Sequence, residues 1–134
     1  MFELKLQTYW SDSDPAGIVF YGNYCRFIEQ AEEELFRAAG AERMTLLKEN
    51  HVWMPRVESF SKFTRPIRAG AAVRLRLHPQ LKGEKTVRYD FQILDDTTTE
   101  TITEGYVTVV CVDATRFNAT PIPEAIRTII LKAC

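Results

Sequence analysis

The stretch Asp12-Ser13-Asp14-Pro15-Ala16-Gly17-Ile18-Val19-Phe20-Tyr21-Gly22-Asn23-Tyr24 leads into the one long helical pattern of the chain. Its two acids, its proline and its two glycines predict a structured loop. The loop meets the positive end of a helix dipole, where backbone amides can polarise a carbonyl or hold an anion. Asp14 is therefore a candidate nucleophile or general base, with helix-terminal amides as oxyanion donors. The alternative is that Asp12 and Asp14 only cap and turn the chain.

The segments on either side of this loop have different periodicities. Before it, Phe2, Leu4 and Leu6 alternate with polar residues, which predicts a half-buried strand running to about Trp10. After it, apolar residues recur every three or four positions, which predicts an amphipathic helix of roughly seventeen residues. Gly40 is the expected C-cap of this helix.

The remainder of the chain is rich in strand patterns. A short helix is expected within residues 41–50 and a terminal helix at 123–132, with strands at 57–63, 72–77, 86–94 and 101–112. Pro79 is expected to end the second of these strands because proline cannot donate to a ladder. One strand, one long helix and then four strands do not alternate as a parallel βαβ fold would. We therefore predict a single α+β domain over residues 1–134, with an antiparallel β-sheet wrapped around one long central helix.

Composition excludes several classes of protein. The 134 residues are 46% hydrophobic and 26% charged, as in an ordinary globular domain. A formal net charge of -1 gives no electrostatic case for nucleic acid binding. The N-terminus shows no signal-peptide pattern, and we expect no membrane span and a cytoplasmic location. Three widely spaced cysteines argue against a disulfide framework or a zinc site, so no metal is expected.

The run Asp12-x-Asp14-Pro15-Ala16-Gly17-Ile18-Val19-x-Tyr21-x-Asn23-Tyr24 resembles the signature of the hotdog-fold acyl-CoA thioesterases of the 4-hydroxybenzoyl-CoA thioesterase family. The resemblance implies that Asp14 is the catalytic carboxylate. It also implies that a backbone amide near Tyr21, at the start of the central helix, polarises the thioester carbonyl. Many relatives of the bacterial acyl-CoA branch carry histidine at this position, so Tyr21 places the chain closer to the aroyl-CoA branch.

Later segments extend the resemblance over nearly the whole chain. Residues Phe63–Gly70 resemble the strand-break segment of the family, while Val109–Asp113 followed by Pro121–Pro123 resemble its ending. The family joins its sheets edge to edge, so a homodimer or homotetramer is implied, with active sites at the interface. Asp14 would then face residues of the partner, and the implied substrate-binding set is Ser59, Phe60, Ser61 and Lys62.

The implied reaction is hydrolysis of an acyl-CoA, with an aromatic or short-to-medium acyl group, to the free acid and CoA. Asp14 either attacks the carbonyl carbon or deprotonates a water molecule, while the amides of Tyr21 and Gly22 hold the oxyanion. No metal or organic cofactor is needed. Lys82 and Lys85 lie where the aroyl-CoA branch places a basic cluster, and they are candidates for the CoA phosphates. The alternative for both is ordinary solvation of a hairpin.

Other interpretations remain open at this point. A Cys25 thiol nucleophile would need His51 or His78, neither of which is near it in sequence. Another hotdog branch uses a helix glutamate, for which Glu32–Glu34 are candidates, although such charge runs are usually solvated faces. A hotdog dehydratase needs a histidine in the helix region, and residues 24–40 contain none. A non-catalytic acyl-CoA-binding or regulatory module would keep the pocket but would not require the carboxylate.

Overall fold

The computed structural model describes all residues from Met1 to Cys134. Five strands form one antiparallel sheet in the order β1-β4-β5-β6-β3, and β2 pairs with β7 in a separate two-stranded ribbon. In chain order the elements are β1 (Phe2–Gln7), η1 (Trp10–Asp12), η2 (Tyr21–Asn23), α1 (Tyr24–Ala38), α2 (Arg43–Glu49), β2 (Val52–Trp53), β3 (Arg56–Phe63), β4 (Ala72–Leu81), β5 (Thr86–Asp95), β6 (Thr101–Val110), β7 (Val112–Asp113) and α3 (Glu124–Ala133). The predicted α+β architecture is confirmed.

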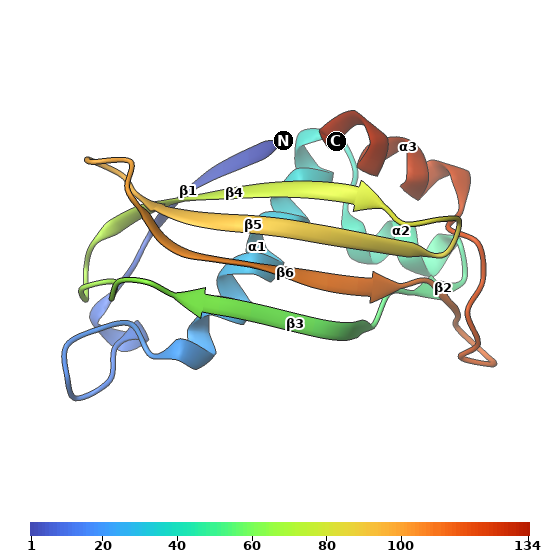
Figure 1. Cartoon of the computed structure of the whole chain (residues 1–134). Helices are drawn as coiled ribbons and strands as arrows, with labels where there is room; N and C mark the ends of the chain where they lie inside the picture. The colour runs from blue at the N-terminus through green and yellow to red at the C-terminus, as the bar shows by residue number, and fades with distance from the viewer.

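The sheet wraps α1 on one face and leaves the other face without a helix. In Figure 1, α1 runs behind the sheet, α2 and α3 gather at one end, and no helix crosses the front. The inward residues of β4 and β5 alternate as predicted, and Leu75, Leu77 and Ile93 are fully buried. They pack with Phe27 and Ala31 of α1 in one core cluster. Each large apolar side chain buried in this way contributes roughly 1.5–3 kcal/mol.

The long helix follows its periodicity closely. The structure gives α1 15 residues, with a 3-10 turn, η2, directly before it. Gly40 has a φ of 83°, the left-handed conformation that ends helices. No helix in the chain combines the length and the apolar character that crossing a bilayer requires.

Three predicted strand ends were wrong. The strand expected over residues 101–112 ends at Val110, and Val112–Asp113 pair with β2 instead. β1 ends at Gln7 rather than near Trp10, because the Asp12 side chain accepts a hydrogen bond from the Tyr9 amide (2.9 Å) and closes a 3-10 turn. Pro79 lies inside β4, which continues to Leu81. β1 pairs only as far as Leu77, so β4 has no neighbour on that side at residue 79, and a proline without an N–H is tolerated there.

Candidate active site

The loop before α1 is a tight turn that begins at Asp14. The Gly17 amide donates to the Asp14 carbonyl (3.0 Å), and the Asp14 amide donates to the Ile18 carbonyl (2.9 Å). The order Asp, Pro, Ala, Gly suits such a turn, because Pro15 presets φ. Gly17 has a φ of 77°, which other residues adopt only with strain. Local sequence therefore determines the shape of the turn.

The turn is fixed to the segment that follows β3. The Val19 amide donates to the Ile67 carbonyl (2.8 Å), and the Ala69 amide donates to the Gly17 carbonyl (3.0 Å). Ile18 and Arg68 form an isolated antiparallel bridge. These contacts hold the turn against a segment about fifty residues further along the chain.

The two acids of the loop have different surroundings. Asp12 is 7% exposed, forms an ion pair with Arg26, and accepts a hydrogen bond from Tyr9. Its backbone carbonyl also accepts a hydrogen bond from the Asn23 side chain (2.8 Å). Asp14 is half-buried, and only its Oδ1 is bonded, to the Ala16 amide (2.8 Å). Asp12 is thus structural, as the capping interpretation predicted, whereas Asp14 keeps a free carboxylate oxygen.

Asp14 lines a cavity of about 280 Å³ between the loop, the start of α1 and the end of β3. One wall is aromatic, because the rings of Tyr24 and Phe63 meet edge to face with centroids 4.9 Å apart. Burial raises the pKa of the Tyr24 phenol above its usual 10.0. The remaining lining residues are Ile18, Val19, Tyr21, Thr64, Arg65 and Pro66.

Two backbone amides at the helix start are free. The backbone amide of Asn23 donates to the Phe20 carbonyl, and the backbone amide of Tyr24 donates to the Tyr21 carbonyl. The backbone amides of Tyr21 and Gly22 have no acceptor within the chain. Unpaired amides at this end of a helix carry its positive partial charge. At Gly22 a Cβ would lie 2.7 Å from the Phe20 ring, so glycine lets that ring fold over the turn.

The other predicted site residues lie away from this cavity within one chain. Ser59, Phe60, Ser61 and Lys62 are on β3, the edge strand of the sheet, and none of them lines it. The hairpin that carries Lys82 and Lys85 joins β4 to β5 at the end of the sheet opposite the Asp14 loop (Figure 1). A single chain therefore brings together Asp14, Tyr21 and Gly22 only.

The cavity also has lining residues that the sequence did not predict, namely Ile18, Val19, Tyr24 and Thr64–Pro66. The sequence signal for these lining residues was the Phe63–Gly70 segment after β3, which resembles a family motif. The motif alone did not predict that this segment packs on the Asp14 loop. Phe63, the first residue of that segment, also lines the cavity.

Competing nucleophiles and acids are occupied elsewhere or lack partners. Cys25 is free and exposed, and no histidine bonds to it. His51 bonds to Thr115 Oγ1 (2.7 Å), and His78 is exposed. Nowhere in the chain do three or more His, Cys, Asp or Glu side chains converge as metal ligands do.

The expected solvated face of the helix glutamates holds for two of the three residues Glu32–Glu34. Glu33 and Glu34 pair with Arg37 on an exposed face. Glu32 is not on a solvated face: its side chain is 3% exposed and is bound by Arg43 Nη1 (3.0 Å) and by Arg56. Ion pairs therefore occupy all three acids.

Comparison with known proteins places this geometry in context. The chain is 24% identical over 127 residues to the acyl-CoA thioester hydrolase YbgC of Escherichia coli, covering 94% of this chain and 92% of that protein. It is 28% identical over 86 residues to the 1,4-dihydroxy-2-naphthoyl-CoA hydrolase of Picosynechococcus, covering 64% and 59%. The matches to three such cyanobacterial hydrolases span between 49% and 64% of their lengths.

Solved structures identify the fold. Slr0204, a 1,4-dihydroxy-2-naphthoyl-CoA thioesterase from Synechocystis, superposes with a TM-score of 0.91 at 18% identity, covering 97% of this chain and 95% of that one. The gentisyl-coenzyme A thioesterase BH1999 gives a TM-score of 0.80 at 22% identity, covering 93% and 98%. The sheet wrapped around α1 is the hotdog fold. Residues 8–130 match the model of the thioesterase-like superfamily, and the chain therefore belongs to that family.

Proposed function

We propose that this protein is an acyl-CoA thioesterase whose catalytic carboxylate is Asp14. One observation carries the proposal: Asp14, with a free carboxylate oxygen, lines the same cavity as Tyr21. The backbone amides of Tyr21 and Gly22, directly before α1, have no acceptor within the chain. A carboxylate that shares a cavity with amides that donate no competing hydrogen bond is the arrangement that acyl transfer needs. Relatives named as hydrolases of naphthoyl-CoA and acyl-CoA thioesters support the same class of reaction.

The reaction follows from thioester chemistry. The substrate carbonyl oxygen accepts hydrogen bonds from the Tyr21 and Gly22 amides, which stabilise the negative charge that develops on it. In one route an Asp14 oxygen bonds to the acyl carbon and the C–S bond breaks. The thiolate of CoA then leaves, and water hydrolyses the mixed anhydride to release the acid and restore the carboxylate. In the other route Asp14 takes a proton from the water that attacks the carbonyl carbon.

The cavity walls indicate the acyl class. Tyr24, Phe63, Ile18 and Pro66 present aromatic and aliphatic surface beside Asp14, and the volume is about 280 Å³. Predominantly apolar pockets with few polar groups orient apolar ligands through those groups. An aromatic or short-to-medium acyl chain fits this lining.

A homodimer through β3 would complete the site. β3 is an edge strand with one unpaired side, and an antiparallel β3–β3 contact about a two-fold axis would extend the sheet. β3 and β5 both begin at the end of the sheet that carries the β4–β5 hairpin. The two-fold axis therefore brings the partner's hairpin, with Lys82 and Lys85, toward the end at which Asp14 lies. These lysines would contact CoA bound mainly by the other subunit.

The first experiment measures thiol release from benzoyl, hydroxybenzoyl, phenylacetyl, short-chain and long-chain CoA esters. We expect Asp14→Asn to lower turnover by at least about a hundredfold while ester binding persists, because the amide is neither a nucleophile nor a base. Asp113→Asn, which removes a charge from β7 in the separate two-stranded ribbon, is the matched control. A wild type that binds these esters but is inert on the whole panel would favour the binding-module alternative.

The second experiment tests the shared site by mixing variants. Asp14→Asn lacks the carboxylate, and the double variant Lys82→Glu/Lys85→Glu lacks the basic hairpin, so we expect each to be poorly active alone. After reversible dissociation and mixing at equal amounts, half of the dimers are mixed and each has one intact site. Activity should then recover to about a quarter of the wild-type value at limiting CoA ester. If no activity is recovered although mixed dimers form, the lysines do not act across the interface.

A further inference from the structure

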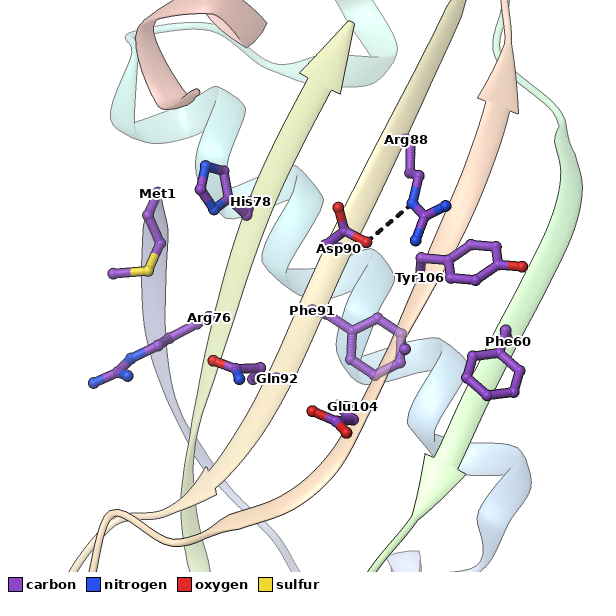
Figure 2. A pocket seen from close by; sticks show the side chains of 11 residues that line it. Met1, Phe60, Arg76, His78, Arg88, Asp90, Phe91, Gln92, Glu104 and Tyr106 are labelled. Atoms are coloured by element: carbon purple, nitrogen blue, oxygen red, sulfur yellow. Dashed lines mark hydrogen bonds and ion pairs between the residues drawn. The ribbon is translucent and has the colours of Figure 1, made fainter. Parts of the chain in front are cut away.

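A second hollow lies on the α1 side of the sheet, at the end away from the Asp14 loop. Its volume is about 330 Å³, and we call it the Trp53 hollow. Apolar and charged side chains line it together: Leu47, Trp53, Met54 and Pro55 with Glu29, Glu32, Arg43 and Arg56. Figure 2 shows a different hollow, of about 510 Å³, on the opposite face of the sheet, which separates that hollow from α1.

Arg56 is the group through which the Trp53 hollow can recognise a polar ligand. Arg56 begins β3, its side chain is 32% exposed, and that side chain bonds only to Glu32 within the chain. A guanidinium has more N–H donors than one carboxylate accepts, so Arg56 keeps free donors beside the hollow. Glu32 is also bound by Arg43 Nη1 (3.0 Å), and it therefore holds Arg56 from inside the fold.

The charges around Arg56 favour a neutral ligand atom. Arg43 and Arg56 form ion pairs with three glutamates, so the negative charges of this cluster outnumber the positive ones by one; the glutamates are Glu29, Glu32 and Glu33. A ligand carboxylate would add to the excess of negative charge. A hydroxyl or carbonyl oxygen accepts a hydrogen bond from Arg56 without that repulsion.

The proposed β3–β3 contact brings this hollow to the active site of the other subunit. When a strand pairs antiparallel with its own copy about a two-fold axis, the start of one lies beside the end of the other. Full overlap of the two strands sets the partner's Arg56 opposite Phe63, with Cα atoms roughly 5 Å apart. Pro55 lines the Trp53 hollow and Thr64 lines the Asp14 cavity. The partner's hollow therefore adjoins the Asp14 cavity across the strand pair.

Both cavities lie on the same face of the extended sheet. Arg56 is in register with the fully buried Val109, and it reaches Glu32 of α1. The Phe63 ring packs against Tyr24 of α1, with centroids 4.9 Å apart. A two-fold axis that pairs edge strands antiparallel within one sheet is perpendicular to the sheet, so both α1 helices stay on one face. The two cavities can then form one continuous site.

We propose that Trp53, Met54 and Arg56 of the partner subunit form the distal part of the acyl site. The acyl group held at Asp14 passes the Phe63 ring, contacts the apolar wall of the hollow and places a terminal oxygen at Arg56. A terminal methyl group would cover donors of Arg56 without bonding to them, which is costly. This inference rests on the proposed thioesterase function. It narrows the substrate to medium-length acyl groups that end in a hydroxyl or carbonyl oxygen.

Paired esters that differ only in a terminal hydroxyl test the role of Arg56. Butanoyl-, octanoyl- and decanoyl-CoA are compared with their terminally hydroxylated forms, and octanedioyl-CoA supplies a carboxylate. For the wild type we expect the hydroxyl to raise kcat/KM about tenfold or more on the longer esters, because it bonds to a charged group. The butanoyl pair should show no preference, and the carboxylate should give no gain.

Arg56→Met should remove this preference, since methionine offers no donor. The ratio compares two substrates on one protein, so a smaller folded fraction does not change it. Arg88→Met, the same replacement in the hollow of Figure 2, is the matched control and should keep the preference.

Mixed dimers test whether the hollow acts across the interface. Trp53→Ala should raise KM about tenfold for decanoyl-CoA and leave butanoyl-CoA unchanged, because only long groups reach that wall. Tyr106→Ala, on the outer face, is the control. In an equal mixture with Asp14→Asn, each mixed dimer joins one intact Asp14 to one intact Trp53. Hydrolysis of limiting decanoyl-CoA should reach about a quarter of the wild-type value, against about a twentieth if Trp53 served its own chain.

The outcomes separate this inference from the proposed function. Equal kcat/KM within every pair, a hydroxyl preference that persists in Arg56→Met, or a twentieth of the activity in the mixture would each overturn the distal site and leave the thioesterase intact. An inert wild type would overturn the proposed function. Calorimetric titration of Asp14→Asn with the same esters would then still decide, since the hydroxylated longer esters should bind about tenfold more tightly.

Discussion

Replacing Glu32 with glutamine should destabilise the protein far more than the same change at Glu34. Glu32 lies inside the fold with a side chain that is 3% exposed, and its main partner, Arg43, is 9% exposed. Burial alone would lower the pKa of the Arg43 guanidinium, but Glu32 and Glu29 outweigh this effect and raise it. The glutamine keeps the shape of Glu32 and removes the charge that compensates Arg43 and Arg56. A buried cation would then lack its principal counter-ion.

The magnitude follows from the burial of the pair. Removing one partner of a buried pair costs about 3–5 kcal/mol, and Arg43 keeps its bond to Glu29 (2.8 Å), so we expect the lower end, about 3 kcal/mol. For a domain of this size that lowers Tm by roughly 10 °C. Glu34 pairs with Arg37 on an exposed face, and Glu34→Gln should cost less than about 1 kcal/mol.

Urea denaturation followed by circular dichroism measures both variants, and thioester hydrolysis is assayed well below the lower Tm. If Glu32→Gln lies within about 1 kcal/mol of the wild type, the cluster is hydrated and the burial argument is wrong. If it is stable but inactive, the helix glutamate takes part in the chemistry. Full activity per folded molecule at reduced stability is the result that we expect.

Two further substitutions test the core of the sheet. Gly105→Ala should lower the free energy of unfolding by about 3 kcal/mol or more, because the new Cβ would lie 1.9 Å from the Phe60 carbonyl oxygen and 2.9 Å from the Phe91 ring. Gly83 has open space around it, so Gly83→Ala should lower the free energy of unfolding by only about 1 kcal/mol in the same urea titration. Tyr89→Phe should leave stability at pH 7 unchanged or raised, because the buried Tyr89 hydroxyl has no partner. Burial, followed by the charge of Glu32, raises the pKa of Tyr89 well above 10.0, so wild-type stability should fall as pH rises above 10.0, and Tyr89→Phe should lose part of that dependence. A loss above about 1 kcal/mol at pH 7 would mean that the hydroxyl is hydrogen-bonded to water.

Much of the fold could be predicted because its signals are local. Apolar residues spaced by three and four positions predict α1, namely Phe27, Ile28, Ala31 and Leu35. The alternation of Val73, Leu75 and Leu77 predicts β4. The features that were missed depend on distant segments. Whether β4 passes through Pro79 depends on where β1 stops, and local sequence does not contain that information.

The same distinction applies to buried charge. Glu32 belongs to a run of three glutamates that is indistinguishable from a solvated helix face in sequence. Its partners come from α2 and β3, which pack against α1 only in the folded chain. Charged neighbours on the outer face of the sheet are equally hidden, because Glu3 and Arg76 become neighbours only through strand register.

The two acids of the Asp12-x-Asp14 pair show how tertiary contacts divide roles between residues of one type. Asp12 binds Tyr9 and Arg26, and through its carbonyl it holds the Asn23 side chain beside the free amides of Tyr21 and Gly22. Asp14 is left with one bonded oxygen and one free oxygen, and it lines the same cavity as Tyr21. The structural acid therefore fixes the distance between the loop and the helix, while the other acid remains available for chemistry. Because these contacts join the loop to α1 before any substrate binds, a carboxylate and two amides can be held in place by an element as irregular as a loop.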